Sequence, residues 1–220
     1  GMTPIWEPGT ASGYHSMTFG WLTSELILRV TGKSLGTYFR EGVGDQHEID
    51  FFIGLPESED HRVAELVPFD IVRNENSDQQ KIELTEAQKS QRNSAGTLDI
   101  QNTKAWRQAE IPSANGQGNA GGLAKFYSLI VPEDNSLKLL KDDTVNQMTT
   151  MQIEGRDLVL AVQARWGVGF ILNKHKVIYG PVESAFGHSG YGGSCAFGDP
   201  ENKIGISYVM NRMLDNFNAD

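Results

Sequence analysis

The stretch Ala185-Phe-Gly-His-Ser-Gly-Tyr-Gly-Gly-Ser194 surrounds a single histidine, His188, with four glycines. Because glycine carries no side chain, a substrate could approach the backbone closely on both sides of this histidine. The apolar residues that follow predict that the stretch leads into a strand. By itself, the pattern is typical of a bent edge strand whose glycines relieve crowding.

Short apolar runs, separated by Gly, Asn, Asp and Pro, fill the last third of the chain around this stretch. Such runs are typical of strands, and we expect them at residues 158–162, 168–172, 194–197 and 204–210. Residues 198–202, Gly-Asp-Pro-Glu-Asn, have the composition of a turn. They should therefore join the last two strands into an antiparallel hairpin.

Helical periodicity dominates the part of the chain before these strands. Residues 18–31 carry apolar side chains at helical spacing and end at Gly32, which suits a left-handed cap. Ser34 can cap a short second helix that runs to residue 40. A third helix is expected at residues 121–131, and Asp142 or Asp143 could open a fourth.

Helices first and strands afterwards indicate an α/β fold of the α+β kind rather than alternating parallel units. We expect one domain over residues 1–220, with a mainly helical lobe at 1–157 and sheet strands at 158–213. The polar stretches 56–62 and 73–93 are expected to be surface loops.

Composition excludes several classes of partner. The formal net charge of -9 disfavours nucleic acid and anionic membranes, which are attracted to basic surfaces. No apolar run approaches the roughly 20 residues of a membrane span. A lone cysteine cannot form an internal disulfide, and no signal-like segment opens the chain. We therefore expect a cytoplasmic protein with small-molecule or protein partners.

Three familiar kinds of site find little support. The histidines are dispersed, and His188 with Cys195 makes only a pair of possible zinc ligands. Cys195 lies in an apolar strand pattern, which is typical of an inert buried thiol rather than a nucleophile. The run Gly190-Tyr-Gly-Gly193 lacks the Gly-Lys-Ser/Thr that completes a phosphate loop. We expect no metal and no cofactor.

Several short segments spread along nearly the whole chain form a recognisable series: Trp6-Glu-Pro-Gly-Thr10, Gly13-Tyr-His-Ser-Met-Thr-Phe-Gly-Trp-Leu22, Ala109-Glu-Ile-Pro-Ser-Ala-Asn115, Arg165-Trp-Gly-Val-Gly-Phe170, Phe186-Gly-His-Ser-Gly190 and Tyr208-Val-Met-Asn-Arg-Met213. In this order they resemble motifs of the class C β-lactamase and serine esterase superfamily. The likeness is greatest to its esterase-like branch, in which a histidine replaces the lysine of the Lys-Thr-Gly box. The resemblance implies a serine β-lactamase-like fold, with an antiparallel sheet flanked by helices and a helical lobe.

The resemblance also implies roles for individual residues. Tyr14 would occupy the tyrosine box and shuttle a proton between nucleophile and leaving group, while His188 would occupy the third box together with Ser189 and Gly190. The backbone N–H of Tyr191 would stabilise the oxyanion. Ser16 stands where lactamases have an asparagine, which weakens the case for a β-lactam amide. An ester or amide of small size is the implied substrate.

The nucleophile that such a site needs is absent from this sequence. In the family, a Ser-x-x-Lys box supplies the serine, and lysine and tyrosine together accept its proton. None of the ten lysines here has a serine or threonine three positions before it. Because the family box precedes the tyrosine box, we expect the chain to be a C-terminal portion of such a hydrolase, incomplete at its N-terminus.

Three hypotheses remain open. The chain is part of a serine hydrolase that acts through an acyl-enzyme when complete, a non-catalytic binding or assembly protein, or a subunit complemented by a separate Ser-x-x-Lys segment. The isolated chain is expected to be inactive. Apolar surface that such a segment would cover predicts self-association or a complementing N-terminal segment.

Overall fold

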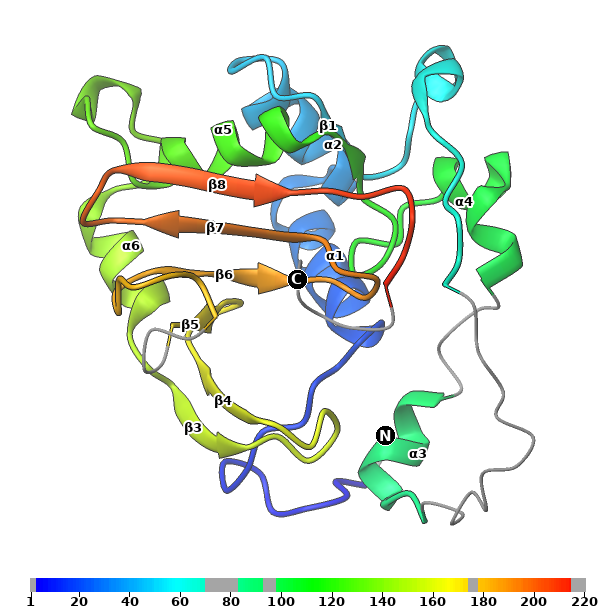
Figure 1. The fold of residues 1–220 in the computed structure, drawn as a ribbon, viewed down its shortest axis with the longest axis vertical. Helices are drawn as coiled ribbons and strands as arrows, with labels where there is room; N and C mark the ends of the chain where they lie inside the picture. Colours follow the sequence, from blue (N-terminus) through cyan, green and yellow to red (C-terminus); the bar gives the residue numbers. More distant parts are fainter. Residues whose placement is uncertain (1–2, 70–82, 93–97, 174–177, 215–220) are drawn as a thin grey trace.

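A six-stranded antiparallel sheet forms the centre of the protein (Figure 1). The structure is a computed structural model that describes residues 3–69, 83–92, 98–173 and 178–214. Each strand of the sheet pairs with the next along the chain, in the order β3-β4-β5-β6-β7-β8. These strands are β3 (Ile153–Arg156), β4 (Gln163–Trp166), β5 (Ile171–Leu172), β6 (Phe186–Ser189), β7 (Cys195–Asp199) and β8 (Ile204–Tyr208).

The predicted hairpin of the last two strands is confirmed by β7 and β8. Their register pairs Phe197 with Ile206. The turn between them is held by the Asp199 carboxylate, which accepts hydrogen bonds from the backbone N–H groups of Glu201 and Asn202, each at 3.0 Å. Of the strand expected at residues 168–172, only its last two residues are extended, as β5.

The strand expected at residues 158–162 is wrong. The Asp157 carboxylate accepts hydrogen bonds from the N–H groups of Val159 and Leu160, so this apolar run folds into a turn. The strands lie on either side of it, as β3 and β4, and the sequence analysis had not predicted β3. The sheet consequently begins at Ile153, before the expected boundary at residue 158.

The glycine-rich stretch that carries His188 forms an interior strand and not the bent edge strand that its composition suggested. β6 pairs with β5 on one side and with β7 on the other, where His188 lies opposite Ala196. Gly192 and Gly193 adopt φ values of 95° and 108°, a left-handed conformation that permits the tight turn from β6 into β7.

The four predicted helices are present. α1 (Thr18–Thr31) ends at Gly32, whose φ of 72° is the expected left-handed cap. α2 (Leu35–Phe39) is capped by Ser34, whose hydroxyl accepts a hydrogen bond from the N–H of Thr37, and it continues into a π-helical turn at Arg40–Gly44. The third and fourth are α5 (Ala120–Ile130) and α6 (Asp142–Thr149).

Short elements complete the first part of the chain. A two-stranded sheet pairs β1 (Phe51–Phe52) with β2 (Gln117–Gly118). The expected loop at 56–62 contains an exposed 3-10 helix, Glu57–Arg62. Of the expected loop at 73–93, residues 73–82 and 93 lie outside the described residues, and the remainder contains α3 (Glu86–Arg92). The other short elements are two 3-10 helices, Leu98–Asn102 and Asn135–Leu137, and α4 (Lys104–Gln108).

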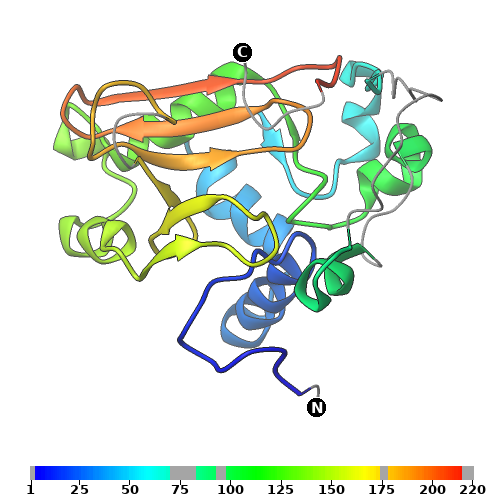
Figure 2. The ribbon, with the colours of Figure 1, turned by 60° about the horizontal axis from the view of Figure 1, so that its bottom comes forward.

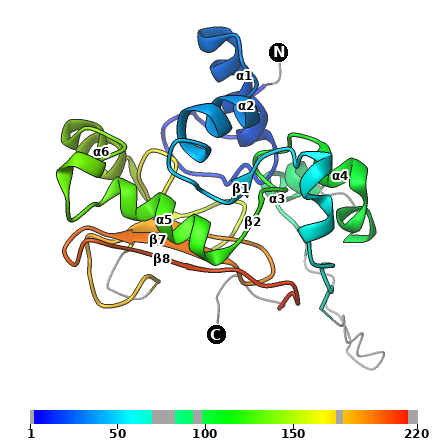
Figure 3. The same cartoon turned by 90° about the horizontal axis from the view of Figure 1, so that it is seen from above.

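The core lies between α5 and the sheet. Tyr127, Ile130 and Val131 of this region pack against Leu172, Phe186 and Ala196 of the strands. α5 lies directly on β7 and β8, and α1 and α2 lie on the same side of these strands but farther away (Figure 3). Within the described ranges, no helix is both long enough and apolar enough to cross a membrane.

The helix α1 exposes an apolar face. It lies at one end of the molecule, away from β7 and β8 (Figure 2). Phe19, Leu22, Leu26 and Val30 follow one another at helical spacing and have exposed fractions of 52%, 66%, 61% and 75%. We call these four residues the α1 face.

Candidate active site

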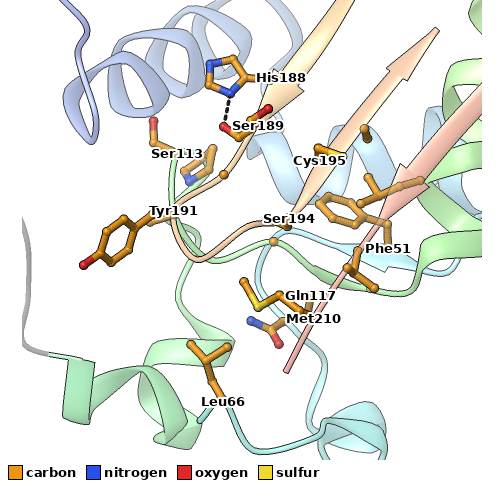
Figure 4. Close-up of a pocket in the computed structure, with 18 of the residues that line it drawn as sticks. Phe51, Leu66, Ser113, Gln117, His188, Ser189, Tyr191, Ser194, Cys195 and Met210 are labelled. Carbon is orange, nitrogen blue, oxygen red and sulfur yellow. Dashed lines mark hydrogen bonds between the residues drawn. The ribbon is translucent and has the colours of Figure 1, made fainter. Parts of the chain in front are cut away.

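An open cleft of about 1470 Å³ lies beside the C-terminal end of β6. Figure 4 shows His188 and Ser189 at the end of this strand and Tyr191 on the loop that follows. All six residues that the sequence analysis predicted for the site line this cleft: Tyr14, Ser16, His188, Ser189, Gly190 and Tyr191. The cleft therefore brings together residues that lie far apart in the sequence.

Tyr14 is held in the cleft by the turn between β3 and β4. It precedes α1 in a segment without regular secondary structure, so its position depends on contacts with the rest of the chain. Its backbone N–H donates a hydrogen bond to Asp157 Oδ1 at 3.1 Å, and the N–H of Leu158 donates to the carbonyl oxygen of Ser12 at 2.9 Å. The two bonds attach residues 12–14 to the sheet.

Three aromatic rings pack together beside the cleft, and two of them, Tyr14 and His188, line it. The Tyr14 ring stacks on His188, with 5.7 Å between ring centroids, and on Trp166 of β4, with 6.0 Å. Trp166 and His188 are themselves 6.1 Å apart. Because ring pairs at such distances attract one another, each ring restricts the orientation of the other two.

The hydrogen bond of His188 defines which of its ring nitrogens can act on a substrate. Its Nδ1 lies 2.7 Å from the carbonyl oxygen of Ser189, and a carbonyl oxygen can only accept, so Nδ1 carries the proton. Burial lowers the pKa of His188, although this hydrogen bond opposes the shift. The ring is therefore neutral at pH 7, and Nε2 presents a lone pair.

The pKa of the Tyr14 phenol is shifted upward, whereas that of His188 is shifted downward. Burial, and then the nearby Asp157 carboxylate, raise the pKa of Tyr14 above its usual value of about 10. Tyr14 is therefore a proton donor at neutral pH, and it can accept a proton from a nucleophile only when a cation lies beside it. The two arginines among the described cleft residues, Arg62 and Arg107, are each already paired with carboxylates.

The loop after β6 contributes Gly190, Tyr191 and Ser194 to the lining of the cleft. The N–H of Gly190 donates a hydrogen bond to the carbonyl oxygen of Ser194 at 2.6 Å, which closes the loop. Tyr191 is half exposed, and its ring meets that of Phe69 edge to face at 5.9 Å. Ser16 lies in the turn that leads into α1. It is far from this loop in the sequence but lines the same cleft.

The other candidate chemistries gain no support. Burial raises the pKa of the Cys195 thiol, so it stays protonated at neutral pH and is a weak nucleophile. Nowhere in the described part of the chain do three His, Cys, Asp or Glu side chains gather in a way that could hold a metal ion.

Sequence reasoning missed two residues that contact the predicted site residues from outside the cleft lining. Trp166 lay within a motif that carried the resemblance, but its contact with Tyr14 and His188 was not predicted. Asp157 was not singled out at all. The only local signal was an aspartate directly before an apolar run, which is also the start of many turns.

A sequence model of the family described as Beta-lactamase matches residues 1–220. The Esterase/beta-lactamase LipL of Mycobacterium tuberculosis (strain ATCC 25618 / H37Rv) is 32% identical over 222 residues, covering 92% of this chain and 49% of LipL. The chain thus spans about half the length of this curated relative.

Solved structures share the fold. A family VIII carboxylesterase superposes with a TM-score of 0.88 at 40% identity, covering 100% of this chain and 57% of that protein. A penicillin-binding protein homolog from Caulobacter crescentus gives a TM-score of 0.82 at 35% identity, covering 100% and 58%. These superpositions confirm the fold class expected from the resemblance.

Proposed function

The chain belongs to the Beta-lactamase family, and we propose that it forms the part of an esterase-like serine hydrolase that carries the tyrosine and histidine of the active site. The observation that supports this most is the stacking of Tyr14 on His188 in one open cleft, 174 positions apart in sequence (188 − 14). Both are side chains that can transfer protons, and such pairs are typical of acyl-transfer sites.

The substrate we propose is an ester of an uncharged acyl group. A lysine in the third box would offer a cation to a carboxylate on the substrate, whereas His188 is neutral at pH 7 and offers a lone pair at Nε2. Ser16, in the position of the lactamase asparagine, provides no amide group to a β-lactam. Both differences favour esters over β-lactams.

The serine that attacks the ester comes, in this proposal, from a Ser-x-x-Lys segment outside the sequence. Its hydroxyl oxygen forms the acyl-enzyme bond, and its proton passes to the Tyr14–lysine pair and then to the leaving alcohol. The lysine cation also supplies what Tyr14 lacks in this chain, because a positive neighbour lowers the pKa of a phenol. The backbone N–H of Tyr191 is our candidate for the oxyanion donor.

The complementing segment would also cover apolar surface. The α1 face is one such surface, and the outer face of β8 is another, since Ile204, Ile206 and Tyr208 point away from α5 and are about two-fifths exposed. Exposed apolar patches of this extent are typical of interaction sites. The chain matches only 49% of the length of LipL, which agrees with a proposal that further residues complete the fold.

Complementation tests the proposal. The chain is mixed or coexpressed with the Ser-x-x-Lys half of a family VIII carboxylesterase, and hydrolysis of p-nitrophenyl butyrate is followed. We expect negligible turnover by either part alone and measurable turnover by the pair. In the pair, Tyr14→Phe should lower kcat by about 10² to 10⁴, the usual contribution of a general acid-base group.

The matched control is Tyr38→Phe, which removes the same hydroxyl from a half-exposed tyrosine outside the cleft and should leave turnover unchanged. Turnover by the chain alone that depends on Tyr14 and His188 would show that no supplied serine is needed. A pair that associates but hydrolyses no ester would contradict the hydrolase proposal itself.

A further inference from the structure

Asp157 is a charged residue in a fully enclosed position. Its exposed fraction is 0%, and it lies between β3 and β4 at the start of the turn that contacts residues 12–14. Oδ1 accepts three backbone hydrogen bonds, from Tyr14 at 3.1 Å and from Val159 and Leu160 at 2.9 Å each. Oδ2 is buried and has no hydrogen-bond partner among the described residues.

Burying a carboxylate has an unfavourable free energy, and holding the turn does not by itself require a negative charge. The amide oxygen of an asparagine could accept the same three hydrogen bonds without bringing a negative charge into the interior. Burying a charge that is only partly compensated is unfavourable. Asp199 holds a similar turn between β7 and β8 and is also buried, but its Oδ2 accepts a hydrogen bond from the side chain of Asn202 at 2.7 Å, whereas Oδ2 of Asp157 has no such partner among the described residues. The charge at position 157 therefore calls for an explanation beyond the turn.

Tyr14 is the neighbouring residue on which the negative charge of Asp157 acts. Asp157 holds the backbone of Tyr14 directly, across 143 positions of sequence, and its charge disfavours ionisation of the phenol. The Tyr14 ring itself stacks on His188 from β6, which titrates, and on Trp166 from β4, which does not. A shift of the Tyr14 peptide would separate the phenol from His188, because no regular element holds it in place.

We propose that Asp157 is a positioning residue for Tyr14: it fixes the peptide that places the phenol against His188 and sets a buried negative charge 3.1 Å from the Tyr14 peptide nitrogen. The placement is a property of the isolated chain. Its catalytic consequence rests on the proposed function, because a phenol kept neutral near a fixed charge becomes a proton acceptor only when the lysine of the supplied segment arrives.

Two substitutions separate the two parts of the proposal. Asp157→Asn keeps an oxygen that can accept the three hydrogen bonds but removes the charge, and Asp157→Ala removes both. Tyrosines of the isolated chain are labelled with ¹³C at Cζ, and the Tyr14 signal is assigned by its loss in Tyr14→Phe. The titration of this signal and the Tyr14–His188 nuclear Overhauser effects are then measured.

We expect Asp157→Asn to retain the Tyr14–His188 effects and to shift the titration of Tyr14 to lower pH. Asp157→Ala should lose the effects. Asp199→Asn is the matched control, since it changes an aspartate that holds a similar turn at the other end of the sheet, and it should leave the Tyr14 signal unchanged. If Asp157→Ala does not fold, the asparagine variant still carries the test.

The proposal is overturned if Asp157→Asn leaves the Tyr14 titration where it was, or if Asp157→Ala keeps the ring contacts. In the complemented enzyme, Asp157→Asn should retain more turnover than Asp157→Ala and should show a displaced alkaline limb of the pH profile. Since the spectra need no turnover, failed complementation with the expected spectra would contradict only the proposed function.

Discussion

At the scale of single residues, the fold controls the protonation of His188. Burial lowers its pKa in the folded state, so below about pH 6.5 the unfolded chain binds a proton more readily than the folded protein does. The contribution of His188 to stability is therefore fully present above pH 6.5 and is lost as the pH falls toward its folded pKa. We expect the free energy of unfolding in urea to decline from pH 7.5 to pH 5.5.

His188→Phe should reduce this decline, because phenylalanine keeps a ring against Tyr14 and Trp166 and does not titrate. His61→Gln alters an exposed histidine of the 3-10 helix and should preserve the decline. Equal slopes in the protein and in His188→Phe would mean that another group causes the pH dependence.

The predicted site residues differ from Asp157 in how much of the sequence is needed to recognise them. Tyr14, Ser16 and His188 were predicted because each lies in a short segment that resembles a motif of the family, and all three line one cleft. Asp157 could not be found in this way. Its position next to Tyr14 depends on the packing of the β3–β4 turn, and the apolar run after it predicted a strand instead.

At the scale of elements, the contact between α5 and β8 depends on a missing side chain. A Cβ atom at Gly205 would overlap the carbonyl oxygen of Ala124 and the backbone nitrogen of Ser128, and backbone atoms cannot move aside as a flexible side chain can. We expect Gly205→Ala to lower the free energy of unfolding by about 1 to 3 kcal/mol, the usual effect of overpacking. Urea denaturation followed by circular dichroism measures it.

Gly42→Ala is the control for this substitution. Apart from its chain neighbours and the backbone of its own helical turn, no atom lies within 4 Å of a Cβ placed there, and alanine is favoured over glycine in a helical turn. Its stability should be unchanged or slightly raised. If Gly205→Ala is as stable as Gly42→Ala, then α5 can move off the sheet without loss.

Helices were easier to predict than strands, for a physical reason. The ends of α1 and α2 are fixed by Gly32 and Ser34, which act on backbone groups a few residues away. A strand is completed by partners far along the chain. β3, Ile153–Arg156, has the polar sequence Ile-Glu-Gly-Arg and was missed, and the interior position of β6 depends on which strands pair with it.

At the scale of the whole molecule, the α1 face is the most exposed part of an apolar surface. Each of its four residues is more than half exposed, although the helix itself is well formed and capped. Because apolar area is driven out of water at about 25 cal/mol per Å², such a face favours association with another polypeptide. In the absence of a complementing segment, a second copy of the chain is the available partner.

We therefore expect the chain alone to self-associate with rising concentration in sedimentation velocity experiments. Leu22→Gln combined with Leu26→Gln should abolish this association without lowering the melting temperature, since both side chains are largely exposed and glutamine is a good helix former. Val168→Gln changes an equally exposed apolar residue in the β4–β5 turn and should leave association intact. A single monomeric species across all concentrations would contradict the predicted self-association. Equal association of the double variant would show that the α1 face is not the surface through which the copies associate.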